Sequence, residues 1–180
     1  AAALLWQGEK QANTLICQGA APHTEHQRGS LMPLLEALCR HYEAGLDRAP
    51  PPWTLAQTLA RLTLPHGARL TLISHHQAPD QALCQQLQRL RLRHDIHYWQ
   101  IRDPLEAALP EQGQLAVQAG RHSGWLAGED PRFRARYQRA AEEQAEACRQ
   151  QLLPLVTRLY RLDNGATLQR QWQEGGCRLF

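Results

Sequence analysis

A short apolar run near residue 70 ends in a group of polar side chains that could do chemistry. Leu70-Thr71-Leu72-Ile73 leads directly into Ser74, His75 and His76. A serine hydroxyl is a nucleophile when a base activates it, and imidazole is both a base and a common metal ligand. We therefore expect any functional site of the chain to include this segment.

The two histidines could form part of a zinc site, with His94, His97 or Asp103 as further ligands. Consecutive residues of a strand point to opposite faces, so His75 and His76 could share one metal only if the strand has already ended. The sequence contains no HExxH motif or comparable spacing. The pattern favours one packed and one exposed histidine, and it leaves a metal-dependent hydrolase that uses His75 and His76 as an alternative.

Ser74 and Asp103 also have structural interpretations. Ser74 lies outside any Gly-x-Ser-x-Gly elbow, which favours a hydrogen bond at the end of the strand over a nucleophile. Asp103 precedes Pro104, and an acceptor followed by proline is a typical helix start. For Asp103 this interpretation is favoured over ligand binding.

These residues need a scaffold of strands and helices. Residues 70–74 do not alternate apolar with polar side chains, which predicts a central parallel strand buried on both faces. We expect Ile73→Asp to leave the protein insoluble, because an unpaired buried carboxylate is costly. Periodicity and capping residues predict the other elements. They are a hairpin of residues 14–17 and 23–28, helices over 31–44 and from Thr54 and Asp80, strands at 96–101 and 115–117, and a short strand within 166–180. A long helix is predicted to begin at Asp130, to be kinked or divided by Pro154, and to end at Asp163-Asn164-Gly165.

The composition limits the class of protein. The chain has 180 residues, enough for one domain, and a formal net charge of +3, too small to recruit nucleic acid or a membrane by itself. Its five cysteines are scattered without paired spacing, as in a cytoplasmic protein with reduced thiols. No apolar run approaches the ~20 residues of a membrane span. We therefore expect a single cytoplasmic domain over residues 1–180, with no nucleic-acid partner and no membrane span.

Three pieces of the sequence, taken in order, resemble a known family. They are Leu72-Ile73-Ser74-His75-His76, then Asp103-Pro104-Leu105-Glu106 with Leu109-Pro110 and Gly113, then the Asp130 helix with Phe133 and Tyr137. This order resembles the bacterial von Willebrand factor A-like proteins of the domain of unknown function fifty-eight, which are usually encoded beside MoxR-type AAA+ ATPases. The resemblance implies a Rossmann-like, von Willebrand factor A-type three-layer α/β sandwich with a mostly parallel central sheet. It also implies that this chain is the C-terminal portion of a longer protein and lacks the first strand, with residues 1–7 as the tail of the helix that follows that strand.

The same resemblance implies a metal-ion-dependent adhesion site for Mg²⁺ at the top of the sheet. In the family, this site combines an Asp-x-Ser-x-Ser loop, a Thr matched here by Thr54, and an Asp at the end of the strand matched by residues 70–74. This sequence contains no Asp-x-Ser-x-Ser, and it has Ser74-His75-His76 where the family has Ser-Asp-Phe. Imidazole removes the charge and the oxygen ligand that Mg²⁺ prefers. We therefore expect a degenerate site that holds no metal or other cofactor.

The function that the resemblance implies is a non-enzymatic protein-interaction domain. It would work with a MoxR-type AAA+ ATPase in assembling or activating another protein complex. The candidate partner-binding residues, at the C-terminal edge of the sheet, are Thr54, Ser74, His75, His76 and Asp103. A purely structural domain of a larger protein is a further alternative. Without the first strand, the sheet would either close with residues 14–17 against 70–74 or self-associate with a second copy.

Overall fold

The computed structural model describes residues 13–17, 25–29, 31–45, 54–75, 78–111, 113–119, 122–163, 165, 167, 170 and 171. The chain divides into two compact units, one formed by Ala1–Pro65 with Leu179–Phe180 and one by His66–Arg178. We describe each unit by itself. The single domain expected from the sequence stays a prediction. The helix tail expected at residues 1–7 and most of the segment 166–180 lie outside the described residues.

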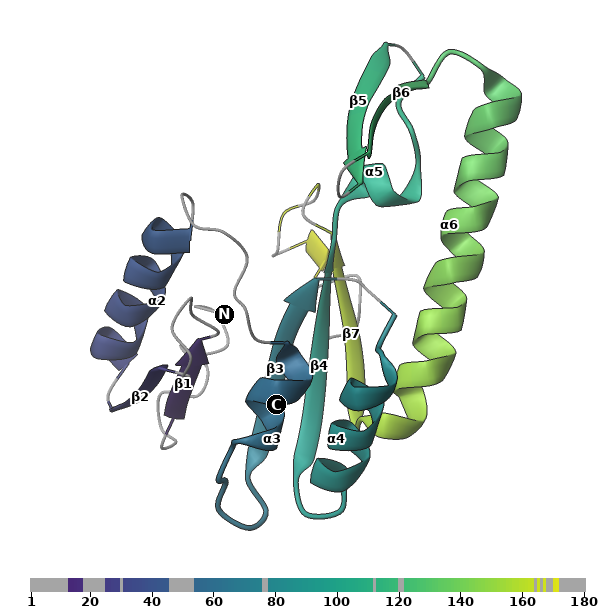
Figure 1. Ribbon diagram of the computed structural model, residues 1–180. Helices are drawn as coiled ribbons and strands as arrows, with labels where there is room; N and C mark the ends of the chain where they lie inside the picture. The colour runs from purple at the N-terminus through teal and green to yellow at the C-terminus, as the bar shows by residue number, and fades with distance from the viewer. Residues whose placement is uncertain are drawn as a thin grey trace. The chain divides into compact units, whose positions relative to one another are not determined.

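In its described residues, the first unit contains a hairpin and two helices (Figure 1). Strands β1 (Asn13–Cys17) and β2 (Glu25–Gly29) pair antiparallel, as the sequence predicted, and α2 (Leu31–Gly45) contacts both. Helix α3 (Leu55–Ala60) begins after Thr54, as expected. Strand β1 belongs to the first unit and β3 to the second, so the expectation that residues 14–17 close the sheet against 70–74 stays a prediction.

The second unit is built on a parallel three-stranded sheet. Its strands are β3 (Arg69–His75), β4 (Asp95–Arg102) and β7 (Arg158–Asp163), in the order β3-β4-β7. Helix α4 (Gln81–Arg91) connects β3 to β4 (Figure 1). A parallel sheet whose strands are joined through helices is a Rossmann-like α/β arrangement. The predicted fold class is confirmed at this level.

Strand β4, and not β3, is the buried centre of this sheet. Ile96, Tyr98, Trp99 and Gln100 of β4 are each at most 2% exposed. Gln100 Nε2 donates a hydrogen bond to Cys148 Sγ over 3.3 Å, which satisfies a buried amide against the long helix. A strand buried on both faces carries consecutive apolar residues, and Tyr98-Trp99 fits that rule.

Strand β3 corrects the prediction of a central strand buried on both faces. It is an edge strand of the described sheet, and its side chains alternate, with Leu70 and Leu72 buried and Thr71 and Ile73 exposed. Ile73 is 42% exposed. The sequence was misleading because Thr and Ile are β-branched and suit a strand on either face. The expected insolubility of Ile73→Asp therefore loses its basis.

Helix α4 follows its sequence signals closely. The Asp80 side chain accepts a hydrogen bond from the Leu83 backbone N–H over 2.7 Å, which caps the helix start. The apolar stripe at Leu83, Leu87 and Leu90 is buried, whereas the arginines at 89, 91 and 93 are exposed.

The long helix also begins as predicted but ends earlier. Helix α6 (Pro131–Leu152) has Asp130 as its cap and proline at its first position. Pro154 lies in a short 3-10 turn, η1 (Leu153–Leu155), because proline cannot continue the hydrogen-bond ladder. The prediction that the helix continues beyond Pro154 and ends at Asp163-Asn164-Gly165 is wrong, since residues 158–163 form β7 and pair with β4.

A second hairpin lies beside the start of α6 (Figure 1). Strands β5 (Gln114–Ala119) and β6 (His122–Ala127) pair antiparallel and form a sheet of their own. The predicted strand at residues 115–117 is thus confirmed, although it lies in this separate sheet, and β6 was not predicted. The short helix α5 (Pro104–Ala107) follows β4. No helix in the described ranges is long and apolar enough to span a membrane.

Candidate functional site

The carboxyl ends of β3 and β4 bring together three of the candidate residues. Register pairs Ser74 with Gln100 and His75 with Ile101, so Ser74 and His75 lie beside the end of β4 that leads into Asp103. This edge is where parallel α/β sheets usually place their ligand sites. His76 lies outside the described residues.

His75 is joined to a residue that the sequence analysis did not select. Its Nε2 lies 2.5 Å from Oε1 of Glu106, and the two side chains are 54% and 33% exposed. This contact ties the end of β3 to α5. Glu106 was quoted in the Asp-Pro-Leu-Glu run, but nothing in the sequence predicted its partner 31 positions away.

Helix α5 places Glu106 through its own local signals. The Asp103 carboxylate accepts a hydrogen bond from the Leu105 N–H over 2.9 Å, and Pro104 occupies the first helical position. The structural interpretation of Asp103 as a helix cap is confirmed. From the other side, the Tyr137 hydroxyl of α6 donates to the Leu105 carbonyl over 2.9 Å. The Asp103 cap, the His75–Glu106 contact and the Tyr137 hydrogen bond hold this one-turn helix in place. A helix this short would have little stability by itself.

Ser74 contacts Tyr98 and not a catalytic base. Burial raises the pKa of the Tyr98 hydroxyl, while its hydrogen bond with the Ser74 side chain acts in the opposite direction. Ser74 and His75 are consecutive strand residues and point to opposite faces of β3. A Ser74-His75-Glu106 triad therefore does not form, and the predicted role of Ser74 in hydrogen bonding at the strand end is confirmed.

Arg102 is the most deeply buried charge at this edge. It is 7% exposed, its Nη2 donates to the Glu106 carbonyl over 3.5 Å, and its Nε has no hydrogen-bond partner among the described residues. Oε2 of Glu106 is likewise buried without a partner there. These two buried polar atoms at the carboxyl edge therefore lack a hydrogen-bond partner within the described part of the chain.

Two of the alternative zinc ligands, His94 and His97, lie at the opposite end of the sheet from His75. His97 pairs in register with Thr71, four positions before His75 on β3, which corresponds to about 13 Å along a strand. His94 precedes β4 altogether. In the described ranges, no three His, Cys, Asp or Glu side chains are grouped closely enough to hold a metal ion. His75, His94 and His97 cannot share one metal in this arrangement.

His97 has a different set of neighbours. Its Nε2 lies 3.2 Å from Oδ2 of Asp95, and its ring lies against Tyr160. Burial lowers the pKa of the His97 imidazole below its usual range, although the Asp95 carboxylate acts to raise it. For Asp95, burial would raise the pKa, but the hydrogen bond from Thr157 and the nearby charges of His97 and Arg69 lower it overall. These residues form a structural cluster at the start of β4.

Thr54 belongs to the first unit, where its hydroxyl is part of a helix cap. Its Oγ1 accepts a hydrogen bond from the Gln57 N–H over 3.2 Å, and Gln57 Oε1 accepts one from the Thr54 N–H over 2.9 Å. This reciprocal arrangement is a capping box. It gives Thr54 a structural role that requires no metal.

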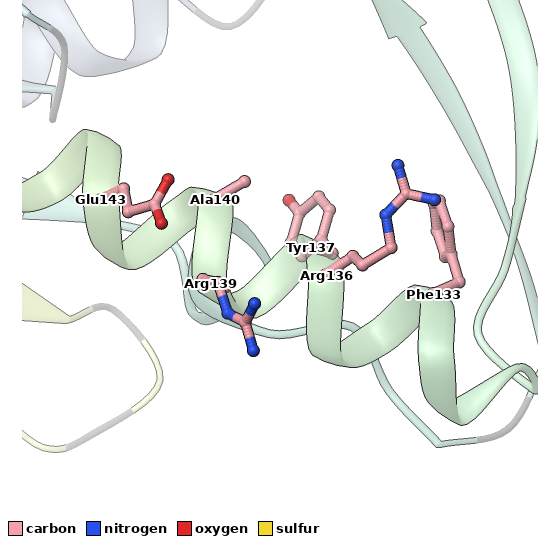
Figure 2. Close-up of a pocket in the computed structure, with 6 residues that line it drawn as sticks. All are labelled: Phe133, Arg136, Tyr137, Arg139, Ala140 and Glu143. Carbon is pink, nitrogen blue, oxygen red and sulfur yellow. The ribbon is translucent and has the colours of Figure 1, made fainter.

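A hollow of about 430 Å³ lies along the N-terminal half of α6 (Figure 2). It is lined by Phe133, Arg136, Tyr137, Arg139, Ala140 and Glu143, all from that helix. Phe133 and Tyr137 carry part of the family resemblance, but nothing in the sequence predicted a hollow beside them. The helical spacing of an aromatic pair among arginines was the available signal.

The family comparison covers the part of the chain that contains α5, the β5–β6 hairpin and most of α6. Residues 36–147 match the family described as protein of unknown function DUF58. No curated protein and no solved structure matched the chain. Because the family match extends over more than half of the 180 residues, the chain belongs to the DUF58 family of proteins of unknown function.

Proposed function

We propose that the chain is a non-enzymatic protein-interaction domain of the von Willebrand factor A type with a degenerate metal-ion-dependent adhesion site. In this proposal it works in the cytoplasm with a MoxR-type AAA+ ATPase, and together they assemble or activate another protein complex. The observation that carries the proposal is the contact of His75 with Glu106 at the carboxyl edge of the sheet. The His75 imidazole occupies the position where the resemblance implies a carboxylate ligand for Mg²⁺. The Glu106 carboxylate contacts that imidazole.

Two exposed apolar side chains flank this contact. Ile73 lies two residues before His75 on the same face of β3, and Leu105 precedes Glu106 in α5. They are 42% and 47% exposed. Apolar side chains exposed beside a polar rim are typical of protein-binding surfaces. We therefore place the partner surface at Ile73, His75, Leu105 and Glu106.

The test measures binding of the purified chain to a MoxR-type ATPase from the same organism by biolayer interferometry. Ile73→Glu and Leu105→Glu should each weaken binding about tenfold or more, because each puts a charge into the apolar part of the surface. Leu92→Glu is the matched control, since Leu92 is 85% exposed and follows α4 at the other end of the sheet. It should bind like the wild type. Absence of wild-type binding, or equal losses in all three variants, would contradict the proposal.

A second arm tests whether a metal takes part. In the absence of nucleotide, the affinity should be the same in Mg²⁺ and in EDTA, because no metal bridges the two proteins. Glu106→Gln keeps the size of the side chain but removes its charge, and it should weaken binding by releasing α5 from β3. An affinity that needs Mg²⁺ would instead indicate a working metal site.

A further inference from the structure

The N-terminal part of α6 presents a face that the described residues leave uncovered. The buried residues of this helix are Ala145, Cys148 and Leu152, all in its C-terminal third. From Pro131 to residue 144 every side chain is exposed or half-buried. Figure 1 shows this half of the helix standing beyond the three-stranded sheet. Helices of globular proteins are stabilised mainly by packing of an apolar face. In the described residues this half of the helix is only partly covered, and its exposed side carries Arg136, Arg139 and Ala140.

Two half-buried aromatic side chains lie along the edge of this exposed side. Phe133, Tyr137 and Ala140 follow one another at intervals of four and three residues, and they line the hollow shown in Figure 2. Phe133 and Tyr137 are half-buried. The hydrogen bond from the Tyr137 hydroxyl to the Leu105 carbonyl holds that ring in place. The hollow therefore has a fixed aromatic floor in the absence of a ligand.

The rim of the hollow carries arginines that have no acidic partner among the described residues. Arg136 and Arg139 are exposed, and neither forms an ion pair there, although Glu143 lies one turn after Arg139. By contrast, Arg149 in the same helix pairs with Glu146 at 2.8 Å. Two guanidinium groups beside an aromatic floor are complementary to a ligand that combines carboxylates with apolar side chains.

We propose that this hollow binds an acidic amphipathic segment of a partner protein. An aromatic or aliphatic side chain of the segment enters between Phe133 and Tyr137, and its aspartate or glutamate residues pair with Arg136 and Arg139. The proposal rests on the chain being a protein-interaction domain, but it does not depend on which ATPase it serves. Arginine and aromatic side chains also bind single-stranded nucleic acid. Glu143 in the lining and a net charge of only +3 favour the peptide.

The experiment uses fluorescence anisotropy with the full 180-residue chain. The probe is a short fluorescein-labelled peptide in which aspartate and glutamate alternate with phenylalanine and leucine. A second peptide has every acidic residue replaced by its amide, and a labelled single-stranded oligonucleotide tests the other class of ligand. The acidic peptide should bind with a dissociation constant that rises with salt, whereas the amide peptide should bind about tenfold more weakly or not at all.

Charge-reversal variants locate the binding to the hollow. Arg136→Glu and Arg139→Glu should each weaken the acidic peptide about tenfold, while Arg93→Glu, an exposed arginine after α4, should leave it unchanged. All three positions are exposed, so the variants should keep the circular dichroism spectrum of the wild type. Tyr137→Phe keeps the ring and should lose less affinity than Tyr137→Ala.

Several results would overturn the proposal. They are no binding of the acidic peptide at millimolar concentration, equal binding of the amide peptide, equal losses in Arg93→Glu, or tighter arginine-dependent binding of the oligonucleotide. The acidic peptide could bind through Arg136 and Arg139 while the MoxR-type ATPase does not bind the chain. That result would support the peptide-binding role of the hollow and contradict the proposed ATPase partnership. The two proposals are thereby separated.

Discussion

Neighbouring residues on β3 should respond very differently to truncation. Leu72 is 8% exposed, whereas Ile73 is 42% exposed on the opposite face of the strand. We predict that Leu72→Ala strongly destabilises the protein and that Ile73→Ala has a small effect. Even Ile73→Asp should remain soluble and fold cooperatively, because its carboxylate can reach water.

The magnitudes follow from the burial of each side chain. Leucine-to-alanine changes at buried sites lower the free energy of unfolding by about 2–5 kcal/mol. Because the Leu72 side chain is buried, we expect Leu72→Ala to lower it by about 3 kcal/mol. Removing the partly exposed Ile73 side chain should cost about 1 kcal/mol or less, since much of its surface is already in water. Against a total stability of about 5–15 kcal/mol, the first loss is large and the second is small.

Urea unfolding followed by circular dichroism measures both effects. The midpoint should fall clearly for Leu72→Ala and only slightly for the two Ile73 variants, with the slope of the transition unchanged. Equal losses at the two positions would refute the edge placement of β3. Insoluble Ile73→Asp protein would refute it as well, because that result requires Ile73 to be buried.

Four further predictions concern charge, metal and assembly. Burial lowers the pKa of the His97 imidazole, so the folded protein binds a proton at His97 less readily than the unfolded chain does. The free energy of unfolding should therefore fall as the pH drops below about 6.5. His97→Gln should weaken that pH dependence in urea titrations. Arg102→Met should change the free energy of unfolding by about 1 kcal/mol or less, since the buried guanidinium makes one long hydrogen bond; a loss above about 3 kcal/mol would show hidden partners. Millimolar Mg²⁺ should not raise the melting temperature, and a rise that Thr54→Ala abolishes would show a metal site. The edge of β3 that has no strand partner in the described sheet should let the 180-residue chain self-associate, which light scattering would detect, and a stable monomer at high concentration would contradict this.

The parts of the fold that sequence predicted were those set by local chemistry. Asp80, Asp130 and Thr54 each accept a backbone hydrogen bond at a helix start, and each was predicted from residue type and position alone. The apolar stripe of α4 was equally local. Such features need only a few adjacent residues, so one sequence suffices to find them.

The parts that sequence missed depend on contacts between distant segments. Residues 158–163 have the spacing of a helix and become strand β7 because they pair with β4, about sixty positions earlier. Ile73 and Leu72 look alike in the sequence, and only the packing of the sheet distinguishes them. The partner of His75 was missed for the same reason, since Glu106 reaches it through the folding of α5 onto β3.

Helix α5 connects the two surfaces for which we propose partners. It has only four residues, yet side chains hold it from both directions: His75 of β3 contacts Glu106, and Tyr137 of α6 donates to the Leu105 carbonyl. Tyr137 also forms part of the hollow on α6, and Leu105 is part of the exposed apolar surface beside β3. A helix this short takes its position from such contacts, because it has too little internal hydrogen bonding to hold itself. The hollow and the surface at the sheet edge therefore both include side chains that hold, or belong to, the same single turn of helix.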